Sequence, residues 1–101
     1  MKIKDGVILH GLKMQMRKVL MEADKIWKKY EQELVITSGL DGAHSAGSLH
    51  YYGFAVDLRT RYFSQEEEAK VYQELSRSLD DRCYRVILHK THYKIVTGKH
   101  I

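Results

Sequence analysis

The sequence predicts an α+β domain in which two helices pack on a small antiparallel sheet. Two segments repeat apolar residues at helical spacing, and several shorter segments are continuously apolar or alternate in polarity, as strands do. Along the chain the order is helix, strand, strand, helix and strands, which is typical of an α+β fold. The 101 residues contain no proline and no low-complexity stretch, so we expect one domain covering residues 1–101.

The first helix is predicted from Leu12 to about Gln32. Its apolar residues recur at steps of three and four, and a stripe of this kind faces a core far more often than it lines a binding groove. Most basic residues of the segment lie off the stripe. The short apolar run Val7–Leu9 is expected to pack against the domain or to form an edge strand. The stripe consists of Leu12, Met16, Val19, Leu20, Ala23, Ile26, Trp27 and Tyr30.

Two strands are predicted in the middle of the chain, at Leu34–Thr37 and Phe54–Arg59. A segment with two glycines, residues 38–42, ends the first strand. The second strand alternates in polarity, which places an aspartate on its polar face. Its residues fall on two faces, with Phe54, Val56 and Leu58 on one and Ala55, Asp57 and Arg59 on the other.

A second helix is predicted to begin after Ser64 and to run to about Leu79. Ser64 and Glu67 form a capping-box pattern, and the acidic residues 66–68 suit the positive end of a helix. The segments Tyr84–Leu88 and Tyr93–Thr97 then indicate two strands or one interrupted strand. The apolar positions of the helix are Ala69, Val71, Tyr72, Leu75 and Leu79.

Composition limits the classes of function. The formal net charge is +4, and the basic residues are scattered, which indicates a solvated basic surface and not a nucleic-acid-binding arm. Cys83 is the only cysteine, so neither an internal disulfide nor a cysteine-based zinc cluster can form, and we expect this residue on a strand in or near the core. Residues 1–5 lack a long apolar stretch, so we expect no signal peptide, no membrane span and a cytoplasmic start.

The segment from Ser48 to Asp57 combines features that a metal site needs. His50 lies in a loop, Gly53 lets the backbone turn, and Asp57 shares a strand face with the small Ala55. A loop imidazole and a strand carboxylate can converge on one cation, and zinc accepts this mixture together with a further histidine and a water molecule.

The further histidine comes from another part of the chain, and His92 is favoured because its β-rich surroundings can hold it rigidly. His44 is expected to line the pocket or to be solvated. His10 and His100 are expected on the surface. The candidates are His10, His44, His89, His92 and His100.

The pattern Ser-x-His-x-x-Gly-x-Ala-x-Asp at residues 48–57 resembles the signature of the zinc D-Ala-D-Ala carboxypeptidase and L-Ala-D-Glu endopeptidase superfamily, whose fold is shared by hedgehog signalling domains. The resemblance implies that His50 and Asp57 bind Zn²⁺ in a hedgehog/DD-peptidase-like fold. A second block of the superfamily reads apolar-apolar-Glu-x-x-His-x-His. Residues 86–94 match its frame and place His92 at the third zinc ligand. Val35–Gly39 also resembles the strand before the signature, so the resemblance covers most of the chain.

Three positions depart from the superfamily pattern. His89 stands where the catalytic glutamate is expected, Leu40-Asp41 replaces an arginine that follows Ser-Gly, and Lys94 replaces the second histidine of the block. His89 has three open interpretations. It serves as the catalytic base, as a fourth zinc ligand that closes the site, or as a plain surface residue.

The resemblance implies a metallopeptidase that acts on peptidoglycan stem peptides, at a peptide bond adjoining a D-amino acid. Small size, a basic surface and a cytoplasmic start fit a phage lysis enzyme, an endolysin, that is released to the cell wall. The alternative is a catalytically silent zinc module that binds a cell-wall fragment or a protein partner. A nucleic-acid-binding domain is a third interpretation, and no motif supports it.

Overall fold

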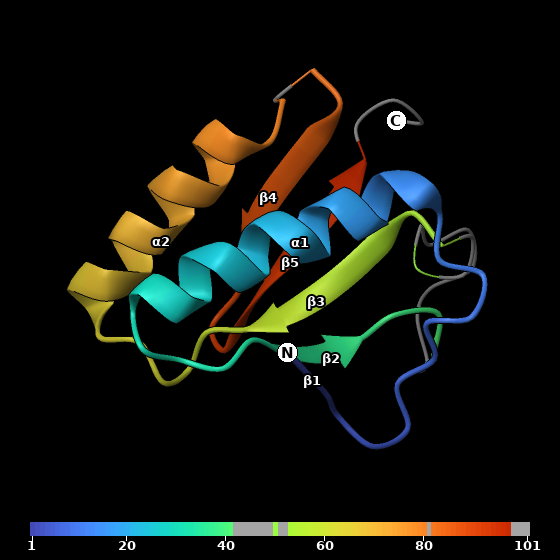
Figure 1. Ribbon diagram of the computed structural model, residues 1–101, viewed down its shortest axis with the longest axis horizontal. Helices are drawn as coiled ribbons and strands as arrows, with labels where there is room; N and C mark the ends of the chain where they lie inside the picture. Colours follow the sequence, from blue (N-terminus) through green and yellow to red (C-terminus); the bar gives the residue numbers. More distant parts are fainter. Residues whose placement is uncertain (42–49, 51–52, 81, 98–101) are drawn as a thin grey trace.

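Two helices and a five-stranded sheet form in the described part of the chain (Figure 1). The computed structural model describes residues 1–41, 50, 53–80 and 82–97. Within the sheet the strand order is β1-β2-β3-β5-β4, and the predicted α+β class is confirmed. The elements are β1 (Lys2–Ile3), α1 (Met14–Lys29), β2 (Val35–Ser38), β3 (Ala55–Arg59), α2 (Gln65–Ser78), β4 (Tyr84–Leu88) and β5 (His92–Thr97).

The sheet is mixed, so the prediction of a purely antiparallel sheet is wrong. β1 runs parallel to β2, whereas the pairs β2–β3, β3–β5 and β4–β5 are antiparallel. The amide of Lys2 donates to the Leu34 carbonyl at 2.7 Å and that of Lys4 donates to the Ile36 carbonyl at 3.0 Å. A strand of two exposed residues has no periodicity that sequence could reveal. The run Val7–Leu9 is not a strand, and Val7 and Leu9 pack half-buried against the core.

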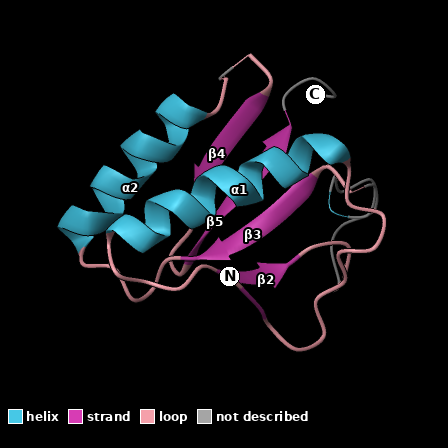
Figure 2. Cartoon of the chain, viewed as in Figure 1, coloured by secondary structure: helices cyan, strands magenta, loops and turns pink. Residues whose placement is uncertain are grey.

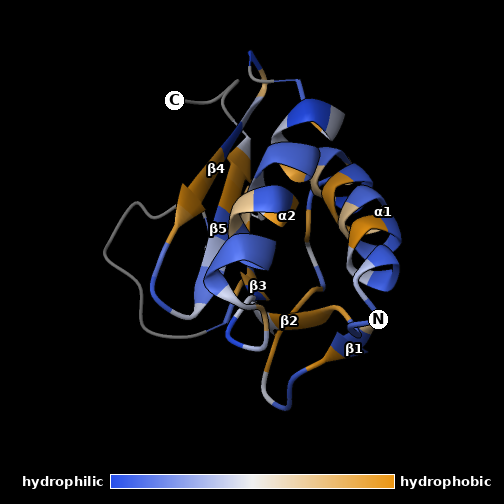
Figure 3. Cartoon of the chain, turned by 90° about the vertical axis from the view of Figure 1, so that its left-hand side faces the viewer, coloured by the Kyte–Doolittle hydropathy of each residue, from blue (hydrophilic) through white to orange (hydrophobic). Residues whose placement is uncertain are grey.

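Both helices lie on one face of the sheet (Figures 1 and 3). The predicted stripe of α1 faces the core, and Met16, Val19, Ala23 and Trp27 are fully buried. The Trp27 ring meets Phe63 edge-on at a centroid distance of 5.5 Å, and it meets Tyr93 of β5 at 6.2 Å. These contacts connect the helix to the sheet, because edge-to-face aromatic pairs add to the stabilisation from burial.

The predicted capping box of α2 is confirmed. The Ser64 hydroxyl accepts from the Glu67 amide at 3.1 Å, and the Glu67 carboxylate accepts from the Ser64 amide at 2.9 Å.

Two other expectations from the sequence, the burial of Ala69 and the placement of Cys83, are wrong. Ala69 is exposed, because its position falls outside the face that α2 turns to the core, and Cys83 lies half-buried in the turn before β4 and not in a strand.

Both helices lie on the same side of the sheet (Figure 2), and the alternation predicted for β3 places different side chains on the two faces. Val56 and Leu58 are fully buried under the helices. Asp57 and Arg59, on the opposite face, are only partly buried. We call the face away from the helices the open face. No helix among the described residues is long and apolar enough to cross a membrane.

Candidate metal centre

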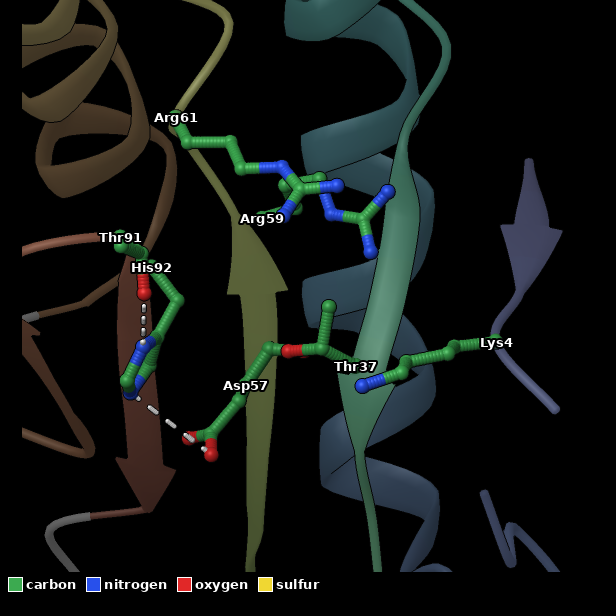
Figure 4. Close-up of a pocket in the computed structure, with 7 residues that line it drawn as sticks. All are labelled: Lys4, Thr37, Asp57, Arg59, Arg61, Thr91 and His92. Carbon is green, nitrogen blue, oxygen red and sulfur yellow. Dashed lines mark hydrogen bonds and ion pairs between the residues drawn. The ribbon is translucent and has the colours of Figure 1, made fainter. Parts of the chain in front are cut away.

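His50, Asp57 and His92, the three residues predicted as ligands, come together on the open face. Strand pairing places Asp57 opposite Lys94 and Arg59 opposite His92, so Asp57 and His92 are diagonal neighbours on one face. Figure 4 shows the His92 ring directed toward the Asp57 carboxylate. His92 Nε2 lies 3.8 Å from Asp57 Oδ2, and His50 Nε2 lies 3.4 Å from Asp57 Oδ1.

The His50 ring is held in a defined orientation and is only 1% exposed. Its Nδ1 lies 2.9 Å from the carbonyl oxygen of Gly39, the residue that follows β2. A carbonyl can only accept, so Nδ1 donates, and the neutral ring then presents a lone pair at Nε2. This Nε2 is the atom that lies beside Asp57 Oδ1. Backbone anchoring of Nδ1 is the usual way in which proteins orient a metal-binding imidazole.

The contact between His50 and Asp57 joins two hydrogen-bond acceptors when the imidazole is neutral. Asp57 Oδ1 is buried and accepts no hydrogen bond from the described residues. Two facing acceptors without a cation between them are unfavourable in a buried place. Two atoms bound to one tetrahedral zinc at about 2.0–2.2 Å are separated by roughly 3.3–3.5 Å, and the observed 3.4 Å falls in this range. The residues present therefore fit a cation held between them.

Burial lowers the pKa of His92, and the neighbouring Lys94 ammonium acts in the same direction, whereas the Asp57 carboxylate opposes them. The neutral ring that this favours has a lone pair available for a metal. Nδ1 of His92 lies 3.4 Å from the Thr91 hydroxyl, a contact drawn in Figure 4.

His89 lies at the end of the β4–β5 hairpin, directly beside His92. The His89 amide donates to the His92 carbonyl at 2.9 Å, and the two rings stack at a centroid distance of 4.7 Å with 20° between their planes. The side chain is exposed. Position 89 thus adjoins the candidate ligands, and its three interpretations stay predictions.

The described residues do not contain a fully assembled metal site. Within residues 1–41, 50, 53–80 and 82–97, no group of three His, Cys, Asp or Glu side chains has the geometry to hold a metal ion. His92 is the farther of the two imidazoles from Asp57. The zinc assignment therefore remains a prediction, supported by the His50–Asp57 pair and by the direction of His92.

The other predicted positions divide into three groups. His10 is exposed, as expected. His44 and His100 lie outside the described residues. Asp41, near the position where the resemblance led us to expect an arginine, has a local structural role. Its Oδ1 accepts from the Ile8 amide at 2.8 Å and from the Gly39 amide at 2.9 Å, which ties the N-terminal segment to the residue that anchors His50.

A basic cluster beside the candidate ligands was not predicted. Lys4, Arg59 and Arg61 line a pocket together with Asp57 and His92 (Figure 4). One feature of the sequence could have indicated this cluster: the alternation of β3 had placed Arg59 on the same face as Asp57. Lys4 reaches the pocket through the unpredicted strand β1.

Comparison with protein-family models, curated proteins and solved structures gives no match for this chain.

Gly53 is expected to be more sensitive to substitution than Gly6, although both have positive φ, of 76° and 87°. A Cβ at Gly53 would collide with the Gly11 carbonyl oxygen, whereas a Cβ at Gly6 would meet open space. Gly53 also donates to the His50 carbonyl at 3.2 Å. We predict that Gly53→Ala lowers the free energy of unfolding by at least about 1 kcal/mol more than Gly6→Ala, as urea denaturation would measure. Equal losses for both variants would contradict this account of the turn.

Proposed function

We propose that the chain is a zinc-binding domain of the metallopeptidase type that acts on peptidoglycan stem peptides. One observation carries the proposal. A buried imidazole and a buried carboxylate oxygen, both acceptors in the neutral state of the ring, face each other at 3.4 Å with a second imidazole directed at the same carboxylate. The resemblance of residues 48–57 to a zinc-binding signature supplies the substrate class.

In the proposed site His50, Asp57 and His92 hold the ion. Zinc bound by three protein ligands supplies Lewis-acid polarisation of a carbonyl and lowers the pKa of a water molecule. The chain's own contribution is to orient these ligands. Gly39 fixes the tautomer of His50, the pairing of β3 with β5 directs Asp57 and His92 toward each other, and Thr91 contacts the remaining nitrogen of His92.

In this proposal His89, which stacks on His92, serves as the proton acceptor. A neutral imidazole can take a proton from the attacking water and pass it to the leaving amine. Its stacking on His92 keeps the ring beside the ligands, although it also restricts the directions in which the ring nitrogens can point. We therefore propose a weak peptidase. Within the same proposal, a phage lysis enzyme that starts in the cytoplasm is the biological setting.

A second candidate function rests on the same position. The absence of a carboxylate at residue 89 favours a catalytically silent zinc module that binds cell-wall fragments or a protein partner. Zinc binding is common to both candidates, and cleavage separates them.

Purified protein is predicted to bind about one zinc ion per chain, because His50, Asp57 and His92 can supply three nitrogen and oxygen ligands. His50→Ala, Asp57→Ala and His92→Ala should each weaken zinc binding by at least about tenfold, since even the loss of a residue that only supports a ligand often has this effect. Competition with a chromophoric chelator measures the affinity. Zinc at about 100 times its dissociation constant should stabilise the fold by about 2.7 kcal/mol, seen as a higher melting temperature.

His10→Ala is the matched control, because His10 is an exposed histidine and is not among the predicted ligands. Its zinc affinity should equal that of the unmodified protein. The assignment is wrong if elemental analysis finds no zinc after incubation at neutral pH. It needs a different third ligand if His92→Ala retains full affinity.

His89→Glu is predicted to raise cleavage of peptidoglycan stem peptides by at least about tenfold, equivalent to about 1.4 kcal/mol of activation barrier. A carboxylate at this position accepts a proton and remains close to the leaving group, whereas the stacked imidazole has less freedom. The assay measures release of free amine from purified wall peptides at neutral pH with zinc present, for both proteins.

The outcomes of this comparison separate the candidate functions. If the unmodified chain cleaves at ordinary enzyme rates and the His89→Glu variant is slower, then His89 is the base. That result would overturn our view that His89, in place of the expected glutamate, weakens catalysis. Bound zinc without cleavage by either protein would favour the silent module.

A further inference from the structure

The pocket beside the candidate metal centre has a basic wall that the proposed zinc chemistry does not use. It has a volume of about 260 Å³ and shares Asp57 and His92 with that centre. The rest of its lining is made by the side chains of Lys4, Thr37, Arg59, Arg61 and Thr91. We call Lys4, Arg59 and Arg61 the basic wall.

Three different segments place the basic wall on the open face. Arg59 follows Asp57 by two residues on β3, so both side chains point to the same side of the sheet. Arg61 follows the end of β3. Lys4 follows β1, where its amide donates to the Ile36 carbonyl of β2 at 3.0 Å. Figure 4 shows the two arginine side chains lying close together on one side of Asp57, and the Lys4 side chain reaching across β2 toward Thr37.

The charges of this pocket are unbalanced. Three cationic side chains stand against the single carboxylate of Asp57, so the lining has a formal charge of +2 with a neutral His92. Some other cations of the chain have acidic partners, for example Lys28 with Asp24 at 3.0 Å. Across the described ranges, by contrast, no carboxylate lies within ion-pair distance of Lys4, Arg59 or Arg61.

Such a pocket favours an anionic ligand group. Cations gathered without acidic partners create a positive potential that attracts an oxyanion, and arginine binds carboxylates through charge-assisted hydrogen bonds. The pocket is smaller than the roughly 300–1,000 Å³ of sites for drug-sized ligands, so it suits one charged end group with its neighbouring atoms. The hydroxyls of Thr37 and Thr91 add neutral hydrogen-bonding groups to the same lining.

We propose that the basic wall is a carboxylate-binding subsite that receives a free carboxylate of a peptide substrate while its peptide bond lies beside His50, Asp57 and His92. This inference rests on the proposed function for the identity of the peptide. The subsite itself depends only on the pocket and its charges. It makes Arg59 and Arg61 specificity-determining residues, because substrates whose carboxylate is masked lose these contacts.

The test compares two probes that differ only in the charged group, N-acetyl-D-alanyl-D-alanine and its C-terminal amide. Binding of each to the full chain is measured by NMR titration, once with a chelator present and once with zinc present. We expect the free acid to bind at least about tenfold more tightly than the amide in both conditions, as charge-assisted hydrogen bonds would give.

The double variant Arg59→Gln, Arg61→Gln should lose this preference. The matched control is Lys70→Gln, Arg77→Gln, which removes the same charge from α2 on the opposite side of the sheet and should keep it. The fold should tolerate the Arg59 substitution, because Trp27 contacts Arg59 through the backbone carbonyl, with Nε1 at 3.3 Å. Circular dichroism checks that the double variant is folded. The single variant Arg61→Gln changes an exposed position and tests the acid preference independently of Arg59.

Equal binding of acid and amide by the unmodified chain would overturn the subsite, and so would a preference that survives in the Arg59, Arg61 variant. Inorganic phosphate is added as a third probe. Phosphate binding that depends on the basic wall, without any preference for the acid peptide, would also overturn the carboxylate assignment. An acid preference in a chain that binds no zinc would support the subsite and reject the proposed function, so the two failures are distinguishable.

Discussion

The antiparallel pairing of β3 with β5 is the constraint on which the candidate site depends. Five residue pairs hold the two strands in register, from Ala55 with Val96 to Arg59 with His92. A shift by one residue would turn Asp57 toward the helices and move Val56 to the open face. Because Val56 and Ile95 are fully buried, such a shift would expose apolar surface and bury a charge. The apolar core thus determines where the polar side chains meet.

The contact between His50 and Asp57 has an energetic cost when the imidazole is neutral, because two hydrogen-bond acceptors then face each other. Both groups are largely removed from water, and the neutral imidazole directs a lone pair at a carboxylate oxygen. Such a contact destabilises a small domain unless a proton or a metal ion lies between the two atoms. A bound cation would turn the same contact into stabilisation, since binding free energy then contributes to folding. Through this energetic effect the geometry supports the proposal that a cation binds here.

Much of the fold was predictable because local patterns specify it. The stripe of α1, the capping box of α2 and the alternation of β3 each reflect a periodicity or a pairing within one segment. The same alternation placed Asp57 on the polar face, and the frame of residues 86–94 led us to expect His92 near it, where the structure places it. The parallel pairing of β1 was not predictable, since two exposed residues carry no pattern and their partners lie more than thirty positions away. For this reason the contribution of Lys4 to the pocket was missed. Cys83 was expected on a strand because it directly precedes the apolar segment Tyr84–Leu88, but it lies in the turn before that strand.

The division of the sheet into two faces separates stability from chemistry in this domain. The helices cover one face, where Trp27, Phe63 and Tyr93 form the aromatic centre of the core. The candidate ligands and the basic wall have their side chains on the other face, where Arg59 is half-buried and Arg61 is exposed. A substitution on the open face therefore removes a charge or a ligand without opening a cavity in the core. His50 is the exception, because it is fully buried and anchored to Gly39, so its loss affects the loop connection as well as any bound ion. Substitutions of Asp57 and His92 therefore show more directly than substitutions of His50 what binds on the open face.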